Sequence, residues 1–236
     1  MKPNKKQVAL TDMKQRILTL DLVPGSGLDE NELSVAYGLS RTPLRELFQQ
    51  LAGEGYVTLA PNRGATVSSM DFTAMRKFFQ TAPMIYASVS RLAAENRTND
   101  QVEQLAKTQK DFRGALKAKS TNEAAMHNHR FHEIIGDMAD NPYLTSSLNR
   151  LLIDHTRMSP TFYRSDTTAN QKRIKLASTQ HDAIIEAINA RKPATAVQLT
   201  LEHWDLSRDQ IEKYVQPDPL PVDGFAEFSE VKRHAV

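Results

Sequence analysis

Apolar residues recur every three or four positions over most of the chain, which is the spacing of amphipathic helices. Between residues 56 and 67 this pattern changes to two short runs rich in β-branched residues. The first helix is predicted over about residues 8–20. A loop containing proline and glycine follows over residues 21–27.

Residues 28–54 predict two short helices separated by a tight turn. Asp29 is a favourable N-cap residue, and Glu32 stands at the spacing of a capping box. Gly38 ends the first helix, because glycine tolerates the left-handed conformation of a C-cap. Pro43 fits the first turn of the second helix, whose apolar face is Leu44, Leu47, Phe48 and Leu51.

The opposite face of the second helix carries Arg41, Arg45 and Gln49, each four residues apart. Arginine can pair bidentately with guanine and glutamine with adenine, so this stripe suits the major groove of DNA. Basic residues at helical spacing are more often simply a solvated face. The assignment therefore depends on the stripe occurring together with the turn and the hairpin that follows.

That hairpin is predicted from strands over residues 56–59 and 65–67, joined by a loop that contains glycine. The tip of the hairpin carries Arg63 and Gly64, which could enter a minor groove or bind a phosphate.

From Phe72 to about Tyr214 the pattern is helical throughout. A first helix of about 24 residues has a continuous apolar seam, which Pro83 is expected to bend. The seam consists of Phe72, Met75, Phe79, Ala82, Tyr86, Val89 and Ala93. Further helices are predicted after Asn99, over 122–138, from Pro142, over 171–190 and over 194–215, with a polar loop over 160–170.

Composition describes an ordinary globular protein, with 40% hydrophobic and 25% charged residues among 236. The chain has no cysteine, which excludes disulfides and thiolate metal sites and fits a reducing cytoplasm. No apolar run approaches the roughly 20 residues of a membrane span, and we expect no signal peptide. The net charge of +2 does not by itself indicate nucleic-acid binding, although a focused basic patch can still attract DNA.

Three histidines, His132, His181 and His203, lie on the apolar stripes of three different predicted helices, and Asn128 stands four residues before the first. A buried imidazole needs a partner, since an unpaired buried polar group costs about 1–3 kcal/mol. A shared divalent cation would satisfy all three, and imidazole suits Zn, Ni, Cu, Fe or Co. The alternative is that each histidine is hydrogen-bonded to a neighbour in the core.

Two segments resemble a known family. Ser-Arg-Thr-Pro-Leu-Arg-Glu at 40–46 and Asn-Arg-Gly-Ala-Thr-Val at 62–67 are similar to the winged helix-turn-helix of the GntR family of bacterial transcription regulators. The resemblance implies a DNA-reading domain over residues 1–70. It also implies DNA contacts from Asn31, Arg41, Thr42, Arg45 and Gly64, where position 31 is often basic in the family.

The second half resembles the FCD ligand-binding domain of the FadR-type GntR branch. The residues that carry this resemblance are Asn128-His129-Arg130-Phe131-His132, Asn141-Pro142-Tyr143-Leu144, the segment 181–188 and His203. It implies an all-helical domain over residues 71–215. The prolines at 217, 219 and 221 separately predict an extended or disordered tail over 216–236. In many members an aspartate and three histidines bind a metal that helps to hold a carboxylate effector. Asn128 stands here in place of the aspartate, and its neutral amide is a weaker ligand.

The effector site departs from the family as well. Ala82 and Tyr86 occupy positions where the family often has arginine and glutamate, so a customary anion-binding arginine is missing. The effector is then less anionic, or it is bound elsewhere, by Arg130 or Arg157 together with Tyr86. His127, His129 and His155 are further candidates for lining the pocket.

The sequence thus predicts a mainly α protein, not an enzyme. It would act as a cytoplasmic homodimeric regulator that binds double-stranded DNA and a small effector, a carboxylate or sugar acid, with Zn or Ni as the metal. One alternative is a regulator for which the metal itself is the signal. Another is a histidine-ligated metal hydrolase, but the run His132-Glu133-Ile134-Ile135-Gly136 lacks the second histidine of the HExxH motif.

Overall fold

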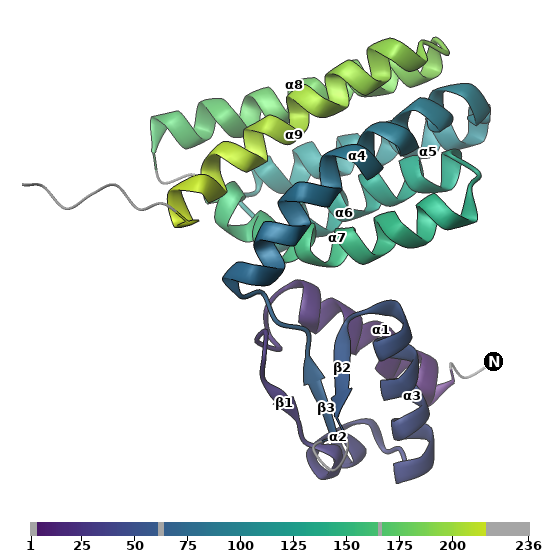
Figure 1. The fold of residues 1–236 in the computed structure, drawn as a ribbon, viewed down its shortest axis with the longest axis vertical. Coiled ribbons are helices and arrows are strands. Elements are labelled where there is room, and N and C mark those ends of the chain that lie inside the picture. Colours follow the sequence, from purple (N-terminus) through teal and green to yellow (C-terminus); the bar gives the residue numbers. More distant parts are fainter. Residues whose placement is uncertain (1–3, 61–63, 165–166, 216–236) are drawn as a thin grey trace, which may run out of the picture.

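The computed structural model describes residues 4–60, 64–164 and 167–215, and side chains as far as Leu206. Within these residues a small N-terminal head lies below a bundle of long helices (Figure 1). The head contains α1 Lys5–Leu18, β1 Gly27–Leu28, α2 Glu30–Tyr37, α3 Arg41–Glu54, β2 Val57–Ala60 and β3 Gly64–Val67. The bundle contains α4 Phe72–Asn96, α5 Asn99–Lys117, α6 Thr121–Met138, α7 Pro142–Tyr163, α8 Thr168–Asn189 and α9 Pro193–Val215.

The ends of α2 follow the capping residues in the sequence. The Asp29 carboxylate accepts hydrogen bonds from the backbone amides of Asn31 at 2.7 Å and Glu32 at 3.0 Å. Gly38 closes the helix in the left-handed conformation, with φ of 59°. The four apolar residues predicted for α3 are all buried, so its core face is confirmed.

The hairpin is confirmed, and a third strand joins it. Strands β2 and β3 pair antiparallel from Val57 opposite Val67 to Ala60 opposite Gly64. Strand β1 pairs with the other edge of β3, with Gly27 opposite Thr66, where the sequence had predicted only a loop. A strand of two residues is too short to show alternation, so the sequence pattern could not predict it. It forms by pairing with β3, which is distant in the sequence.

Two features of the bundle differ from the sequence pattern. Phe72 is 58% exposed, whereas Phe78 is 4% exposed and packs in the core, so the buried seam of α4 begins later than predicted. The first turn of α4 lies at the end of the bundle nearest the head (Figure 1). The predicted loop over 160–170 is also shorter, because α7 continues through Pro160 to Tyr163 and buries its last turn in a small apolar cluster.

Helix α7 holds the head against the bundle. Its residue Ile153 is 1% exposed and belongs to the apolar core of the head. The buried guanidinium of Arg157 donates from Nη1 to the carbonyl oxygen of Ser68, at 2.7 Å, and pairs with Asp154. The Ser68 hydroxyl donates in turn to the Gly55 carbonyl at 2.7 Å.

Arg150 completes this arrangement, since it approaches Asp154 at 3.7 Å and its side chain fills the space beside Gly55. We call Arg150, Asp154 and Arg157, with Gly55 and Ser68, the interdomain clamp. In the described part of the chain, no helix is both long and apolar enough to cross a membrane.

Two glycines near the end of α3 provide a matched test of the clamp. Gly55 has φ of 90°, and a Cβ there would collide with Arg150, so Gly55→Ala should destabilise the protein by more than about 1 kcal/mol. Gly53 lies within α3 with open space around it, so Gly53→Ala should stabilise by about 0.5–1 kcal/mol. Urea unfolding of both variants measures the difference, and equal effects would contradict both the left-handed backbone at Gly55 and the close approach of Arg150.

Candidate functional site

Three of the predicted metal ligands meet in the centre of the bundle. His132 on α6, His181 on α8 and His203 on α9 are all buried, and one nitrogen of each lies within 4.8 Å of the others. The Nε2 atoms of His181 and His203 are 3.2 Å apart. The structure therefore brings together three imidazoles that are far apart in the sequence.

Hydrogen bonds to two glutamine side-chain oxygens indicate which nitrogen of His181 and of His203 faces the centre. Gln109 donates from Nε2 to the Ser178 carbonyl at 2.8 Å, which directs its Oε1 toward His181 Nδ1 at 2.9 Å. Gln180 Oε1 lies 3.1 Å from His203 Nδ1. Both Nδ1 atoms therefore act as donors, and both Nε2 atoms present lone pairs to each other. Two facing lone pairs need a cation or a proton between them.

Two further atoms at this centre lack a hydrogen-bond partner among the described residues. They are His132 Nε2 and Asn128 Oδ1, both buried. Leaving such groups unpaired costs about 1–3 kcal/mol each. Three imidazole nitrogens and one amide oxygen form a donor set that suits a borderline cation such as Zn or Ni. The residues present therefore fit a divalent cation.

The protonation of the imidazoles agrees with this role. Burial lowers the pKa of His132 and His181 well below the ordinary value, and the neighbouring imidazoles lower both further. Burial also lowers the pKa of His203 to about 4. The rings are thus neutral near neutral pH, which is the form that binds metals.

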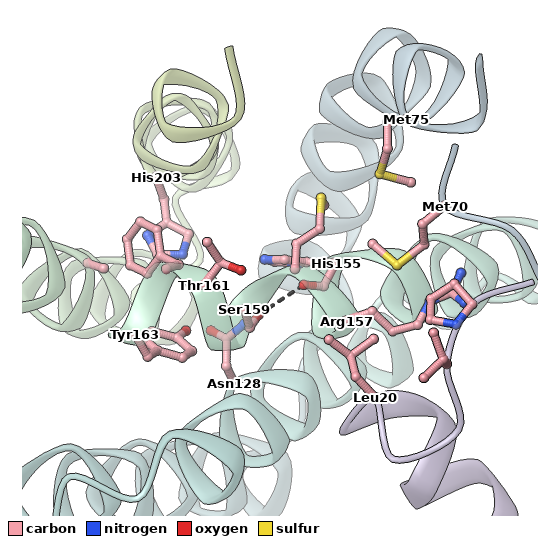
Figure 2. A pocket seen from close by; sticks show the side chains of 15 residues that line it. Leu20, Met70, Met75, Asn128, His155, Arg157, Ser159, Thr161, Tyr163 and His203 are labelled. Carbon is pink, nitrogen blue, oxygen red and sulfur yellow. Dashed lines mark hydrogen bonds between the residues drawn. The ribbon is translucent and has the colours of Figure 1, made fainter. Parts of the chain in front are cut away.

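A cavity of about 400 Å³ begins beside the histidine cluster and reaches the head. Figure 2 shows Asn128, Tyr163 and His203 on one side of it and Leu20, Met70 and Met75 on the other. The lining residues are Leu20, Val23, Pro24, Met70, Met75, Asn128, His155, Arg157, Met158, Ser159, Thr161, Phe162, Tyr163, Ala177 and His203. The head residues among them gave no signal in the sequence, because a loop has no periodicity that indicates which way its side chains point.

The three predicted effector residues lie in different places. Arg157 lines the cavity. Tyr86 is buried and does not line the cavity, but its hydroxyl is hydrogen-bonded at 2.7 Å to Nδ1 of His155, which does. Arg130 does not line it, because its guanidinium lies on the outer side of α6 in an ion pair with Glu133 at 2.6 Å.

Of the remaining histidine candidates, only His155 lines the cavity. Burial lowers the pKa of His155 to about 3, with neighbouring histidines lowering it further, so this ring is neutral in the cavity wall. His129 is hydrogen-bonded to the Thr156 hydroxyl at 2.7 Å and lines a different hollow, between α1 and α6. His127 is half-buried and does not line the cavity.

The polar stripe of α3 lies on the surface of the head. Arg41, Thr42, Arg45 and Gln49 are all exposed, on the side of the helix opposite its buried face. Arg41 Nη2 lies 3.5 Å from the amide oxygen of Asn31, so residues of α2 and α3 share this surface. Gly64 begins β3 with φ of 69°. Arg63 lies outside the described residues.

Arg45 is paired with Glu30 at 3.3 Å while its side chain remains 65% exposed. An ion pair this exposed contributes only about 0–1 kcal/mol, so the guanidinium can exchange its partner at low cost. The surface thus offers two arginines, an amide and a hydroxyl to a groove of DNA.

Comparisons with known proteins agree with both parts of the structure. Residues 5–67 match the family of bacterial regulatory proteins described as gntR, and residues 83–206 match the FCD domain. The HTH-type transcriptional repressor RspR of Escherichia coli is 32% identical over 130 residues, which cover 53% of this chain and 57% of RspR. The chain thus matches little more than half the length of that relative.

Other relatives match over more of their length. The gluconate operon transcriptional repressor of Bacillus subtilis is 21% identical over 85% of this chain and 82% of its own. Among solved structures, Escherichia coli McbR/YncC has a TM-score of 0.75 at 17% identity, covering 90% of this chain and 99% of that one. A GntR regulator from Rhodococcus has a TM-score of 0.66 at 17% identity, covering 88% and 97%. These two structures share the fold.

The hydrogen bond between Tyr86 and His155 can be tested directly. Tyr86→Phe removes the hydroxyl and leaves a buried neutral imidazole without that partner, so it should destabilise the protein by about 1–3 kcal/mol. Tyr143→Phe is the control, because the Tyr143 side chain is 85% exposed and should change stability little. Urea unfolding measures both, and equal stability of the two variants would mean that the bond contributes nothing.

Proposed function

The chain belongs to the gntR family of bacterial regulatory proteins and carries an FCD domain, and from this premise we propose that it is a ligand-responsive repressor of transcription. It acts in the cytoplasm as a homodimer on a pseudo-palindromic operator. The observation that carries this proposal is the exposed stripe of Arg41, Arg45 and Gln49 opposite a fully buried helix face. The printed names of RspR and the gluconate operon protein, both repressors, support the sign of regulation.

DNA reading follows from the placement of α3. In winged helix-turn-helix proteins the second helix of the pair enters the major groove, and a dimer reads two half-sites at a fixed spacing. Arg41, Arg45 and Gln49 then contact base edges, while Asn31 and Thr42 bind the backbone. Gly64 and Arg63 contribute from the wing.

The effector is a small carboxylate or sugar acid bound in the cavity beside the histidine cluster. A divalent cation, Zn or Ni, is held by His132, His181, His203 and Asn128. When bound, the cation supplies a positive centre that attracts a carboxylate oxygen. The unpartnered Asn128 Oδ1 and His132 Nε2 support this assignment. Tyr86 supports the cavity wall through His155, and Arg157 contributes its guanidinium to the wall itself.

Regulation requires that the effector prefer one arrangement of the heads, because a ligand shifts an equilibrium only by its differential affinity. The interdomain clamp provides a route for this preference. Arg157 touches both the cavity and the Ser68 carbonyl, so a ligand beside Arg157 changes the contact that holds the head.

A second candidate function is a regulator in which the cation is itself the signal, and the same unpartnered atoms favour it. The neutral amide of Asn128 argues for weaker metal binding than a carboxylate would give. A metal hydrolase has less support, because Gly136 interrupts the HExxH spacing and the family consists of regulators.

DNA binding is tested by selecting sequences from randomised duplexes and measuring the affinity of variants for the selected site. Arg45→Ala should weaken specific binding by about 10- to 100-fold, the loss expected for one bidentate base contact worth about 1–3 kcal/mol. Lys107→Ala is the control for charge, since Lys107 is exposed on α5 in the bundle. An unchanged sequence preference in Arg45→Ala would contradict the groove assignment.

Metal binding is tested by elemental analysis and by titrating the chelator-treated protein with Zn²⁺ or Ni²⁺. The unmodified chain should bind about one ion, His181→Ala should lose it, and Asn128→Asp should bind at least about tenfold more tightly, or ~1.4 kcal/mol. The gain is expected because a carboxylate adds a negative charge to a neutral donor set. If neither the unmodified chain nor Asn128→Asp bound metal, the cation site would be withdrawn.

A further inference from the structure

The head supplies one wall of the effector cavity. Leu20, Val23 and Pro24, in the loop after α1, face the cavity together with Met70 at the entry to α4. All four side chains are apolar. Asn128 and His203 of the histidine cluster lie at the other end (Figure 2). The Arg157 guanidinium also lies at the head end, but Asp154 and the Ser68 carbonyl already engage it.

We propose that the effector is a monocarboxylate with an extended apolar body, whose body lies directly against the head. This proposal rests on the proposed function, because it places the carboxylate at the polar end beside the histidine cluster. The apolar body then extends past Met75 and Met158 toward Leu20 and Met70. A sugar acid would instead bring hydroxyl groups against these apolar side chains, where they would lose hydrogen bonds to water.

The backbone of Leu20 supports a role for its side chain. Leu20 has φ of 67°, a left-handed conformation at the residue that follows the C-cap of α1. Glycine is the usual residue at such a position, because a side chain there costs free energy. Among the described residues the other non-glycine positions of this kind are Lys119, Asp140 and Arg191, all exposed and polar. Leu20 is the apolar residue among these four positive-φ residues, and its side chain lines the effector cavity.

Contact with the head gives the ligand a direct way to select a head position. The cavity has its full wall only when the loop 20–24 lies against the bundle, as the clamp holds it here. A ligand that buries its apolar body against this loop therefore binds this arrangement more tightly than one in which the head has moved away. Such a difference in affinity is what a regulatory ligand requires.

The test compares monocarboxylates of increasing chain length by calorimetric titration of the full chain with Zn²⁺ present. The probes are butanoate, hexanoate and octanoate, with gluconate as the polar carboxylate and octan-1-ol as the uncharged control. Each added methylene that is buried against the loop should raise affinity about fourfold, the ratio that corresponds to ~0.8 kcal/mol per CH₂. Octanoate should then bind more than tenfold more tightly than butanoate, and more tightly than octan-1-ol.

Variants of the head locate the apolar body. Leu20→Gly removes the side chain at a position whose backbone favours glycine, so the fold should persist. It should reduce octanoate affinity at least fivefold and leave butanoate affinity unchanged. Val23→Ser, at a residue 60% exposed, is the second variant and should act in the same direction. Val8→Ala, exposed on α1 away from the cavity, should have no effect.

The outcomes separate the two proposals. If gluconate or butanoate binds as tightly as octanoate, and Leu20→Gly binds octanoate like the unmodified chain, the apolar contact with the head is overturned while a carboxylate effector stands. If none of the carboxylates binds, the carboxylate effector is overturned and the head contact with it. Chain-length dependence that disappears in Leu20→Gly and Val23→Ser supports the inference.

Discussion

The position of the head depends on one buried charge. The Arg157 guanidinium is almost completely buried, and its hydrogen bonds go to Asp154 on its own helix and to the Ser68 carbonyl between the two parts. A hydrogen bond made by a charged group contributes about 1.5–3 kcal/mol, and a buried donor left without its acceptor is costly. Separating the head from α7 would remove the Ser68 carbonyl from the guanidinium, so the linker stays close to this helix.

Helix α7 consequently joins functions that the sequence keeps in separate segments. Its residues Arg150, Asp154 and Arg157 hold the linker, and Ile153 completes the core of the head. Between and beyond them, on the same helix, His155 and Ser159 form part of the cavity wall. One helix therefore carries both the cavity wall and the contacts that hold the head.

The sequence predicts what depends on local periodicity and capping. The buried face of α3, the end of α2 at Gly38 and the inward direction of His132, His181 and His203 all follow from spacing alone. Features that depend on contacts between distant segments were not predictable in this way. Strand β1 exists because β3 lies beside it, and Leu20 lines the cavity because of how the head packs. Arg130 does not line the cavity, and its ion pair with Glu133 could not be predicted from periodicity.

The burial of Ile153 in the head limits how freely this architecture can be rearranged by recombination. A head moved onto the bundle of another regulator would meet a different side chain at this position, and a smaller one would leave a void in its core. Successful chimaeras should therefore carry the facing turn of α7 along with the head. By the same reasoning, the structural unit to transfer is the head together with this turn of α7.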